Sequence, residues 1–578
     1  MEPENRAKPY QDVIMTYQET YLRWRTSVKE ENLLNELESI KDDDAQIKER
    51  FISDLPFGTA GLRGIIGAGI TRMNRYVVGR ATQGLADYLM ASGKTGKCMV
   101  IAYDSRQFSR EFAEETACVF AGNGIKACIF KQLTSVPELS YAVRHLKADG
   151  GIVITASHNP SQYNGYKVYA AYGGQLGPEE SLEVMDCIQK LDPFKDVKRI
   201  GYREGVAKGL IHEIGEEIDR LYYERIVALC GAESADDLKV VYTPLHGTGL
   251  RTVENVFPAA GINNLFIVEE QRTPDGLFPT VNSPNPEDPG AMKMAIALAG
   301  RLGAQLAIGT DPDADRMGAA VRRQDGTYVM LTGNQIGCIL INYLLERRRS
   351  SGMLRSSDYI IKSFVSTDMA DAIARHYGVT SYTVMTGFRF ISELITKNEK
   401  TDAEFIFGFE ESYGFLSGTF TLDKDGVLAA LLLCKAAQYY RNQGQSLLEV
   451  LEKLYETHGY YLEGVKNIAF TGLDGMDKMR EIMTGLREKP IGVVGDLAVQ
   501  YIEDYLSRIS TAADGKVSDI QLPAANAVKL MLERSAWICI RPSGTEPKIK
   551  IYYAVREAKR KTAESQLKSI ANSFERMI

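Results

Sequence analysis

The sequence predicts an α/β fold built from several parallel or mixed sheets. Short runs of apolar, mostly β-branched and aromatic residues end in Gly, Ser, Thr, Asp or Asn, and longer segments with helical periodicity follow them; this is the pattern of βα units. A chain of 578 residues is too long for one ordinary core, so we expect three to five domains. The runs that predict strands are 98–106, 151–159, 238–247, 304–316, 358–367 and 404–412.

A helical flank is expected before the first sheet. Within residues 15–51, apolar side chains recur at roughly helical spacings among charged ones, which predicts one or two amphipathic helices. These apolar positions are Tyr17, Tyr21, Trp24, Val28, Leu33 and Leu37.

The C-terminal part of the chain has a different pattern. After residue 470 we expect helical segments, then two strands around a Pro/Ser/Gly turn within 535–555, and a final charged helix. This predicts a smaller α+β domain. Polar or glycine-containing joints then give four domains, namely 1–210, 211–330, 331–465 and 466–578.

Composition excludes several classes of protein. The 68 basic and 75 acidic residues give a net charge of −7 without long blocks of one sign, so no nucleic-acid partner is expected. The sequence has no apolar run of membrane-spanning length and no signal peptide, and we expect a cytoplasmic protein without a membrane partner. Its eight cysteines are far apart and it has only six histidines, which predicts free thiols and no zinc site.

The run GIVITASHNP (151–160) ends in a possible nucleophile, Ser157. A serine-hydrolase site is not expected, because the elbow pattern GxSxG is absent. In an extended chain, moreover, the ring of the adjacent His158 would point away from the Ser157 hydroxyl. Taken alone, Thr155, Ser157 and Asn159 could equally be ordinary polar residues of a turn.

The sequence DPDADR (311–316) places three carboxylates at alternate positions, where Asp311, Asp313 and Asp315 can turn toward one hard cation. A calcium-binding EF-hand loop is excluded, since Arg316 and Arg322 stand where that loop needs Gly and Glu. Oxygen ligands alone favour Mg²⁺, which would act as a Lewis acid on a phosphoryl group. An acidic surface turn is the alternative.

Two further motifs could bind the parts of a phosphosugar. In GFEESYGF (408–415), Glu410 and Ser412 suit the vicinal hydroxyls of a sugar, although a plain polar turn explains them equally well. In RPSGTEP (541–547), a guanidinium, two hydroxyls and turn amides form a phosphate cradle. Its residues are Arg541, Ser543, Gly544 and Thr545. No P-loop pattern occurs in the sequence.

In this order, the four motifs resemble those of the α-D-phosphohexomutase superfamily, and the resemblance covers almost the whole chain. FGTAGLRG (57–64) is similar to the segment of this family that carries a phosphate-contacting arginine, here Arg63. NGYK (164–167), TGF (386–388) and DKDG (423–426) also resemble family segments. The length of the chain and the sequence DPDADR (311–316), which we call the metal loop, resemble most those of the bacterial phosphoglucomutases and of the related phosphoglucomutase and phosphopentomutase group. Pro312 stands where many members have Gly, which removes no ligand.

The resemblance implies a fold and an activity. The fold would have four domains around a central cleft, three α/β and one smaller α+β, each contributing one motif. Ser157 would carry a phosphoryl group and, with Asp311, Asp313 and Asp315, would hold Mg²⁺. The enzyme would interconvert glucose 1-phosphate and glucose 6-phosphate through glucose 1,6-bisphosphate.

The resemblance also implies residue roles. His158 and Lys167 are the candidates for proton transfer, with the division between them open, and Arg63 contacts phosphate. The substrate-binding residues would be Arg316, Thr386, Gly387, Glu410, Ser412, Lys424, Arg541, Ser543, Gly544 and Thr545. The alternatives are a pentose or mannose phosphate substrate, glucose 1,6-bisphosphate synthesis, a Mg²⁺-dependent phosphatase, and a non-catalytic phosphosugar-binding protein. The sequence leaves open whether the protein is a monomer or a homodimer.

Overall fold

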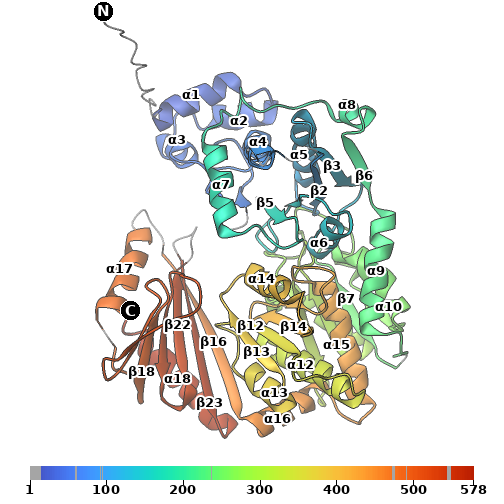
Figure 1. The fold of residues 1–578 in the computed structure, drawn as a ribbon, viewed down its shortest axis with the longest axis vertical. Helices are drawn as coiled ribbons and strands as arrows, with labels where there is room; N and C mark the ends of the chain where they lie inside the picture. Colours follow the sequence, from blue (N-terminus) through green and yellow to red (C-terminus); the bar gives the residue numbers. More distant parts are fainter. Residues whose placement is uncertain are drawn as a thin grey trace, which may run out of the picture.

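The chain forms four sheets in sequence order, each with its own helices (Figure 1). The structure is a computed structural model that describes residues 15–58, 61–91, 93, 96–235, 237–470, 475–489, 491–542 and 548–578. The first three sheets are covered by helices and the fourth is the largest. The prediction of α/β units followed by a C-terminal α+β domain is confirmed, and the structure shows that this last part is rich in sheet.

Between residue 15, where the described chain begins, and the first sheet there are three helices, whereas one or two were expected. They are α1 (Tyr17–Ser27), α2 (Glu31–Ser39) and α3 (Asp44–Phe51). The third helix is separate because the Asp43 side chain accepts a hydrogen bond from Gln46 N and so caps a new helix. The three helices share a buried cluster centred on Trp24, Leu37 and Phe51.

The first sheet has six strands in the order β1-β5-β4-β2-β3-β6. Its strands are β1 (Gly61–Ile65), β2 (Cys98–Tyr103), β3 (Lys126–Phe130), β4 (Gly150–Ile154), β5 (Tyr163–Ala170) and β6 (Ile211–Ile214). Strands β4, β2, β3 and β6 run parallel, while β5 and β1 continue the sheet in antiparallel pairs. Its helices are α4 (Arg75–Ala91), α5 (Ser109–Gly122), α6 (Val136–His145), α7 (Pro178–Gln189) and α8 (Tyr202–Ala207).

The second sheet has the order β11-β10-β9-β7-β8. Its strands are β7 (Val240–Thr243), β8 (Leu265–Ile267), β9 (Leu306–Thr310), β10 (Met317–Arg322) and β11 (Tyr328–Met330). The accompanying helices are α9 (Glu216–Cys230), α10 (Gly249–Ala259), the short 3₁₀ helix η1 (Glu269–Gln271) and α11 (Pro289–Leu302). Strand β7 pairs in parallel with β8 and β9, and the hairpin β9–β10 carries the metal loop at its tip.

The third sheet has the order β13-β12-β14-β15. Its strands are β12 (Tyr359–Ser363), β13 (Thr380–Val384), β14 (Phe405–Glu410) and β15 (Gly414–Leu416). Its helices are α12 (Gly333–Ser350), α13 (Met369–Tyr377), α14 (Phe388–Asn398), α15 (Gly426–Arg441) and α16 (Leu447–His458). All six apolar runs that predicted strands form them, as β2, β4, β7, β9, β12 and β14.

The last unit is mostly an antiparallel sheet, and here the prediction of several helical segments after residue 470 is wrong. In the described residues one helix, α17 (Gly475–Glu488), is followed by strands up to the final helix α18 (Arg560–Phe574). Strand β16 (Tyr460–Ala469) precedes α17. The strands after α17 are β17 (Val493–Val494), β18 (Leu497–Asp504), β19 (Ile509–Ala512), β20 (Val517–Asp519), β21 (Val528–Leu532), β22 (Trp537–Pro542) and β23 (Lys548–Glu557), with η2 at Glu533–Ser535. Several are short and bury only part of their surface, so their apolar pattern is weak.

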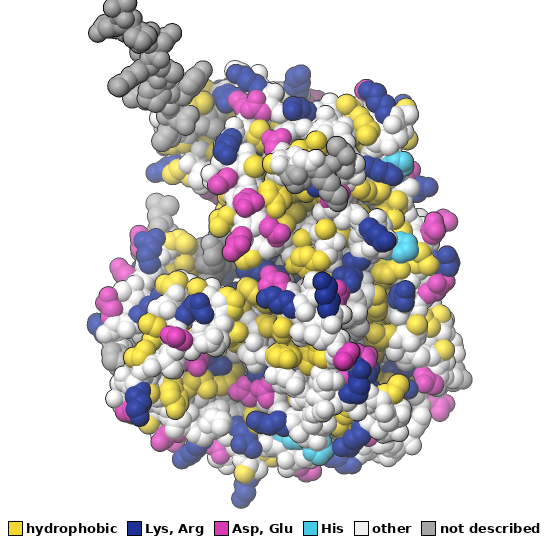
Figure 2. All heavy atoms as spheres, in the orientation of Figure 1, with side chains coloured by type: hydrophobic (Ala, Val, Ile, Leu, Met, Phe, Trp, Pro, Cys, Tyr) yellow, Lys and Arg dark blue, Asp and Glu magenta, His cyan; other side chains and the backbone are white. Residues whose placement is uncertain are grey.

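The first three units share one large cluster of buried side chains, and each also has a cluster of its own, whereas the last unit has a separate core. A single cluster of buried side chains includes Val100, Tyr242 and Ile360 from the first three sheets. A separate cluster fills the last sheet, and a smaller one around Phe364 and Trp537 joins it to the third. Figure 2 shows the surface hollowed between the blocks that hold α7 and α17. The domain boundaries at 210, 330 and 465 stay predictions.

Every helix in the described ranges is too short or too polar to serve as a membrane span.

Candidate active site

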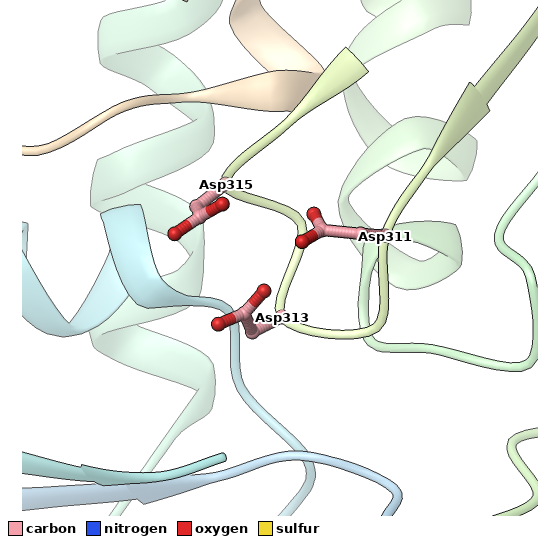
Figure 3. A group of neighbouring side chains, drawn as sticks. All are labelled: Asp311, Asp313 and Asp315. Atoms are coloured by element: carbon pink, nitrogen blue, oxygen red, sulfur yellow. The ribbon is translucent and has the colours of Figure 1, made fainter. Parts of the chain in front are cut away.

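Three aspartates face one another in the loop between β9 and β10 (Figure 3). Asp311, Asp313 and Asp315 are at most 2% exposed, and one oxygen of each lies within 4.8 Å of the others. Within the described chain, Asp313 Oδ1 and Asp315 Oδ1 are buried without a hydrogen-bond partner. Buried carboxylate oxygens need a partner, and a hard cation with oxygen ligands fits this donor set.

The pKa values of two of these groups are shifted in opposite directions. Burial, together with the negative charges of Asp313 and Asp315, raises the pKa of Asp311 well above its usual value. Burial alone would also raise the pKa of Asp315, but Lys424, Lys167 and Arg316 outweigh it and lower that pKa. The nearby cations therefore stabilise the negative charge of Asp315, whereas the negative charge of Asp311 stays unfavourable beside its two neighbouring carboxylates.

Ser157 faces the metal loop from the end of β4. Its Oγ donates a hydrogen bond to Asp311 Oδ2 over 2.7 Å, and the residue is 3% exposed. The backbone is not extended here, because Ser157 has a φ of 51°. The expectation that His158 points away from the Ser157 hydroxyl is therefore wrong, since His158 Nδ1 lies 3.2 Å from Oγ.

Lys167 contacts the carboxylates rather than the serine. From β5, its Nζ donates to Asp313 Oδ2 over 2.7 Å and to Asp315 Oδ2 over 3.2 Å. Burial lowers the pKa of Lys167, but these two carboxylates outweigh burial and raise it overall. For His158, burial and the charges of Arg316 and Arg63 lower the pKa well below its usual value.

Two arginines connect the loops of the site. We call the segment 155–162, between β4 and β5, the serine loop. Arg63, on β1, donates from Nη1 to Asn159 Oδ1 in this loop over 3.0 Å. Arg316 donates from its backbone N to Asp311 Oδ1 over 2.9 Å and from Nη1 to Ser412 O over 3.2 Å. Arg316 thus joins the metal loop to the motif predicted to bind sugar.

The predicted sugar-binding motif lies at the end of β14. Glu410 is 8% exposed, and its Oε1 accepts a hydrogen bond from Gly387 N over 2.6 Å. Burial raises the pKa of Glu410, although the positive charge of Lys424 opposes this. Gly387 has a φ of 113°, which favours glycine. Thr386 and Ser412 are half-buried beside these two residues in the chain.

Lys424 lies with the metal loop. Its Nζ is 3.2 Å from Asp315 Oδ2 and 3.0 Å from Asp423 Oδ1. Asp423 Oδ2 in turn accepts a hydrogen bond from Tyr169 OH over 2.7 Å. The segment DKDG at the start of α15 therefore connects the third unit to the metal loop of the second and to the sheet of the first.

Of the phosphate motif, the structure describes Arg541 and Pro542 alone. Ser543, Gly544 and Thr545 lie outside the described residues. Arg541, on β22, is close enough to Tyr552 for its charge to act on that phenol, and no hydrogen bond or ion pair within the described chain joins it to the serine or metal loop. Three of the four predicted motifs thus come together in this arrangement.

Sequence reasoning missed Asp104 and Arg106, which support the serine loop from the end of β2. Thr155 Oγ1 lies 2.6 Å from Asp104 Oδ2, and Ser157 N donates to Thr155 Oγ1 over 2.8 Å. The same strand-end rule that located Ser157 could have found both residues, because the run 98–106 ends in Asp-Ser-Arg.

The fold and the site together are those of an α/β enzyme that transfers phosphoryl groups. Three consecutive stretches match the phosphoglucomutase/phosphomannomutase family: α/β/α domain I over residues 54–194, domain II over 220–326 and domain III over 332–458. The chain belongs to this family, and the resemblance to α-D-phosphohexomutases is confirmed.

Curated relatives extend the similarity over most of the chain. The phosphoglucomutase of Staphylococcus saprophyticus is 37% identical over 503 residues, which cover 87% of this chain and 90% of that protein. The phosphoglucomutase of Staphylococcus aureus is 38% identical over 519 residues, covering 89% and 92%. Among solved structures, the open form of parafusin, a Paramecium phosphoglucomutase, covers 90% of this chain and 94% of its own, with a TM-score of 0.68 and 18% identity. This last similarity concerns the fold.

Proposed function

We propose that this chain is a phosphoglucomutase that interconverts glucose 1-phosphate and glucose 6-phosphate. The observation that carries the proposal is the contact of Ser157 Oγ with Asp311 Oδ2, at 2.7 Å. Beside it are two buried carboxylate oxygens that have no hydrogen-bond partner in the described part of the chain. A serine in this position can carry a phosphoryl group next to a bound cation. The names of the staphylococcal relatives support glucose phosphate as the substrate.

Mg²⁺ would be held by Asp311, Asp313, Asp315 and the phosphate on Ser157. When bound, it supplies Lewis-acid stabilisation of the negative charge on the phosphoryl group. Lys167 already donates to two of these carboxylates, so it holds a positive charge beside the same group.

The transfer breaks the bond between phosphorus and Ser157 Oγ and forms one between phosphorus and O6 of glucose 1-phosphate. The net proton movement is from the O6 hydroxyl to Ser157 Oγ. We assign the proton exchange at the serine to His158, because its Nδ1 lies 3.2 Å from Oγ. In the second half of the cycle, glucose 1,6-bisphosphate returns its other phosphoryl group to Ser157 and glucose 6-phosphate leaves.

Both orientations of the bisphosphate need a sugar contact and a second phosphate contact. Glu410, which accepts a hydrogen bond from Gly387 N, and Ser412 would bind the ring hydroxyls, with Thr386 beside them. Arg63, Arg316 and Lys424 surround the serine and metal loops. Arg541, Ser543, Gly544 and Thr545 would bind the distal phosphate.

A coupled assay with Mg²⁺ and a trace of glucose 1,6-bisphosphate tests the proposal. We expect kcat/KM for glucose 1-phosphate to exceed that for mannose 1-phosphate and ribose 1-phosphate at least tenfold. A preference for the pentose phosphate above tenfold would overturn the assigned substrate. Release of free phosphate at the rate of isomer formation would indicate a phosphatase instead.

A further inference from the structure

One buried arginine binds most of the serine loop. The Arg106 side chain is 0% exposed. Its Nη2 donates to Ser157 O over 2.6 Å and also to Asn159 O. Its Nη1 donates to Pro160 O over 2.9 Å and to Tyr163 O over 3.0 Å. A single guanidinium therefore serves four carbonyl groups between residues 157 and 163.

The serine loop needs such a donor because of its own conformation. Ser157 has a left-handed φ of 51°, a strained conformation for a residue other than glycine, which persists only where the surrounding structure holds it in place. Residues 157–162 belong to no helix or strand. Gln162 O accepts from Ile66 N over 2.8 Å, and the carbonyls of Ser157 and Asn159 accept from Arg106 instead. The planar guanidinium of arginine has five N–H donors and can bond several carbonyls at once. The compact ammonium of lysine cannot reach carbonyls that are spread along a plane in this way.

The guanidinium is itself held from two sides. Asp104 Oδ2 lies 3.4 Å from Arg106 Nε, and Asp104 Oδ1 accepts from Arg106 N over 2.9 Å. On the other side, the Phe278 ring centroid lies 4.9 Å from Arg106 Cζ. Phe278 comes from the second unit, in the segment between η1 and α11.

The segment between η1 and α11 makes two more contacts, one with the serine loop and one with the backbone around Arg106. Ser283 Oγ donates to His158 O over 2.7 Å. The backbone at Gly276 lies against residues 105–107, so closely that a Cβ there would be 2.5 Å from Gln107 N. The second unit therefore covers both Arg106 and the loop that Arg106 holds.

We infer that Arg106 is a positioning residue that fixes Ser157 in the left-handed conformation in which its Oγ faces Asp311, and that Phe278 holds the guanidinium in place from the second unit. The inference rests on the proposed function for its kinetic consequence. Its structural part, the order of residues 157–163, does not depend on which sugar phosphate the enzyme uses.

The test compares Arg106→Lys with Arg110→Lys, a matched change four residues away at an exposed arginine that pairs with Glu114. We expect Arg106→Lys to lower kcat for glucose 1-phosphate by about tenfold to a hundredfold, because small misplacements of a reacting group have effects of this size. KM should change less than threefold. Amide hydrogen exchange in the peptide that spans 157–163 should become at least tenfold faster, and Arg110→Lys should match wild type in all three.

Phe278 provides a second route to the same answer if Arg106→Lys folds poorly. Phe278→Leu should lower kcat and speed exchange in the same peptide, whereas Phe278→Tyr, which keeps the ring, should stay near wild type. If amide hydrogen exchange in the peptide 157–163 keeps its wild-type rate in both Arg106→Lys and Phe278→Leu, the inference is wrong. It is also wrong if activity falls only in proportion to the amount of folded protein. If the wild-type enzyme does not interconvert the glucose phosphates, the proposed function fails, while the exchange rates still decide the role of Arg106.

Discussion

Ser157 Oγ and Asp311 Oδ2 are joined by a 2.7 Å hydrogen bond although their loops follow strands of different sheets. A second bond across the same boundary joins Val136 N, at the start of α6, to Asp313 O over 3.0 Å. The side chains behind these contacts belong to one continuous core. The serine and metal loops therefore meet because the first two units are packed together, so the site does not exist in either unit alone.

Ser157→Ala should abolish mutase turnover, because the variant has no oxygen that can carry the phosphoryl group. It should also lose the gain of about 80 Da that phosphorylation adds to the tryptic peptide. Intact mass, peptide mapping and the coupled assay measure both effects. Ser351→Ala, at an exposed serine after α12, is the control and should retain activity and the modification. Full activity in Ser157→Ala would refute the mechanism.

Asp311→Asn should have opposite effects on stability with and without metal. Without Mg²⁺ the change relieves repulsion from Asp313 and Asp315, so the apparent unfolding temperature should rise. We expect about 1 °C for each kcal/mol gained, because the entropy of unfolding grows with chain length. With Mg²⁺ at a hundredfold excess over its Kd, wild type should gain about 2.7 kcal/mol and the variant much less.

Differential scanning fluorimetry with and without EDTA measures these shifts. Asp514→Asn, at an exposed aspartate in the last unit, controls for the loss of a charge as such. Equal stabilisation of wild type and Asp311→Asn by Mg²⁺ would show that the three aspartates are not the metal site.

Lys167→Met should strengthen metal binding while it slows the reaction. Removing a positive charge within 3.2 Å of Asp313 and Asp315 leaves the carboxylates freer to bind a cation, and we expect the Kd for Mg²⁺ to fall about tenfold. Turnover should fall about a hundredfold, the usual size of the effect when a charged group beside a reacting phosphate is lost. Titration calorimetry and the coupled assay separate the two, with Lys516→Met as the exposed control. Weaker metal binding in Lys167→Met would contradict the assigned role.

The strands that carry the site were predictable because each ends in polar residues after a buried run. That rule located Ser157, the aspartates and Glu410. It did not predict the orientation of His158, since the left-handed turn at Ser157 depends on hydrogen bonds from Arg106, which lies in the loop after β2. Arg106 itself acts on backbone carbonyls, and no sequence pattern records which carbonyls a side chain will reach.

The last unit was the least predictable part of the fold. Strands such as β18 (Leu497–Asp504) mix exposed and buried residues without a strict alternation, and helical periodicity is easily read into such a pattern. The sequence also did not predict which residues join this unit to the third unit. Trp537 Nε1 donates to Asp368 Oδ2 over 3.0 Å, and Lys529 Nζ donates to Phe364 O over 3.0 Å.

Glu463 lies where β16 enters this last sheet, and it should make stability depend on pH. Its carboxyl group interacts with Thr367 and Asn334 of the third unit, and burial raises the pKa of Glu463 from 4.5 to about 7. Because the folded state favours the protonated form, the stabilisation is complete below about pH 4.5 and is lost as the pH rises through 7. A shift of this size corresponds to about 3 kcal/mol.

Glu463→Gln keeps the hydrogen-bonding side chain without the charge, so it should unfold later than wild type at pH 8 and together with it at pH 4.5. Urea titrations in a Trp24→Phe background test this, because Trp537, which shares the pairing partner Ala554 with Glu463, is then the only tryptophan. Glu564→Gln, at an exposed position of α18, should follow wild type at every pH. If Glu463→Gln loses stability between pH 4.5 and 7 as steeply as wild type does, the charge of Glu463 does not control the joint between the third and last units.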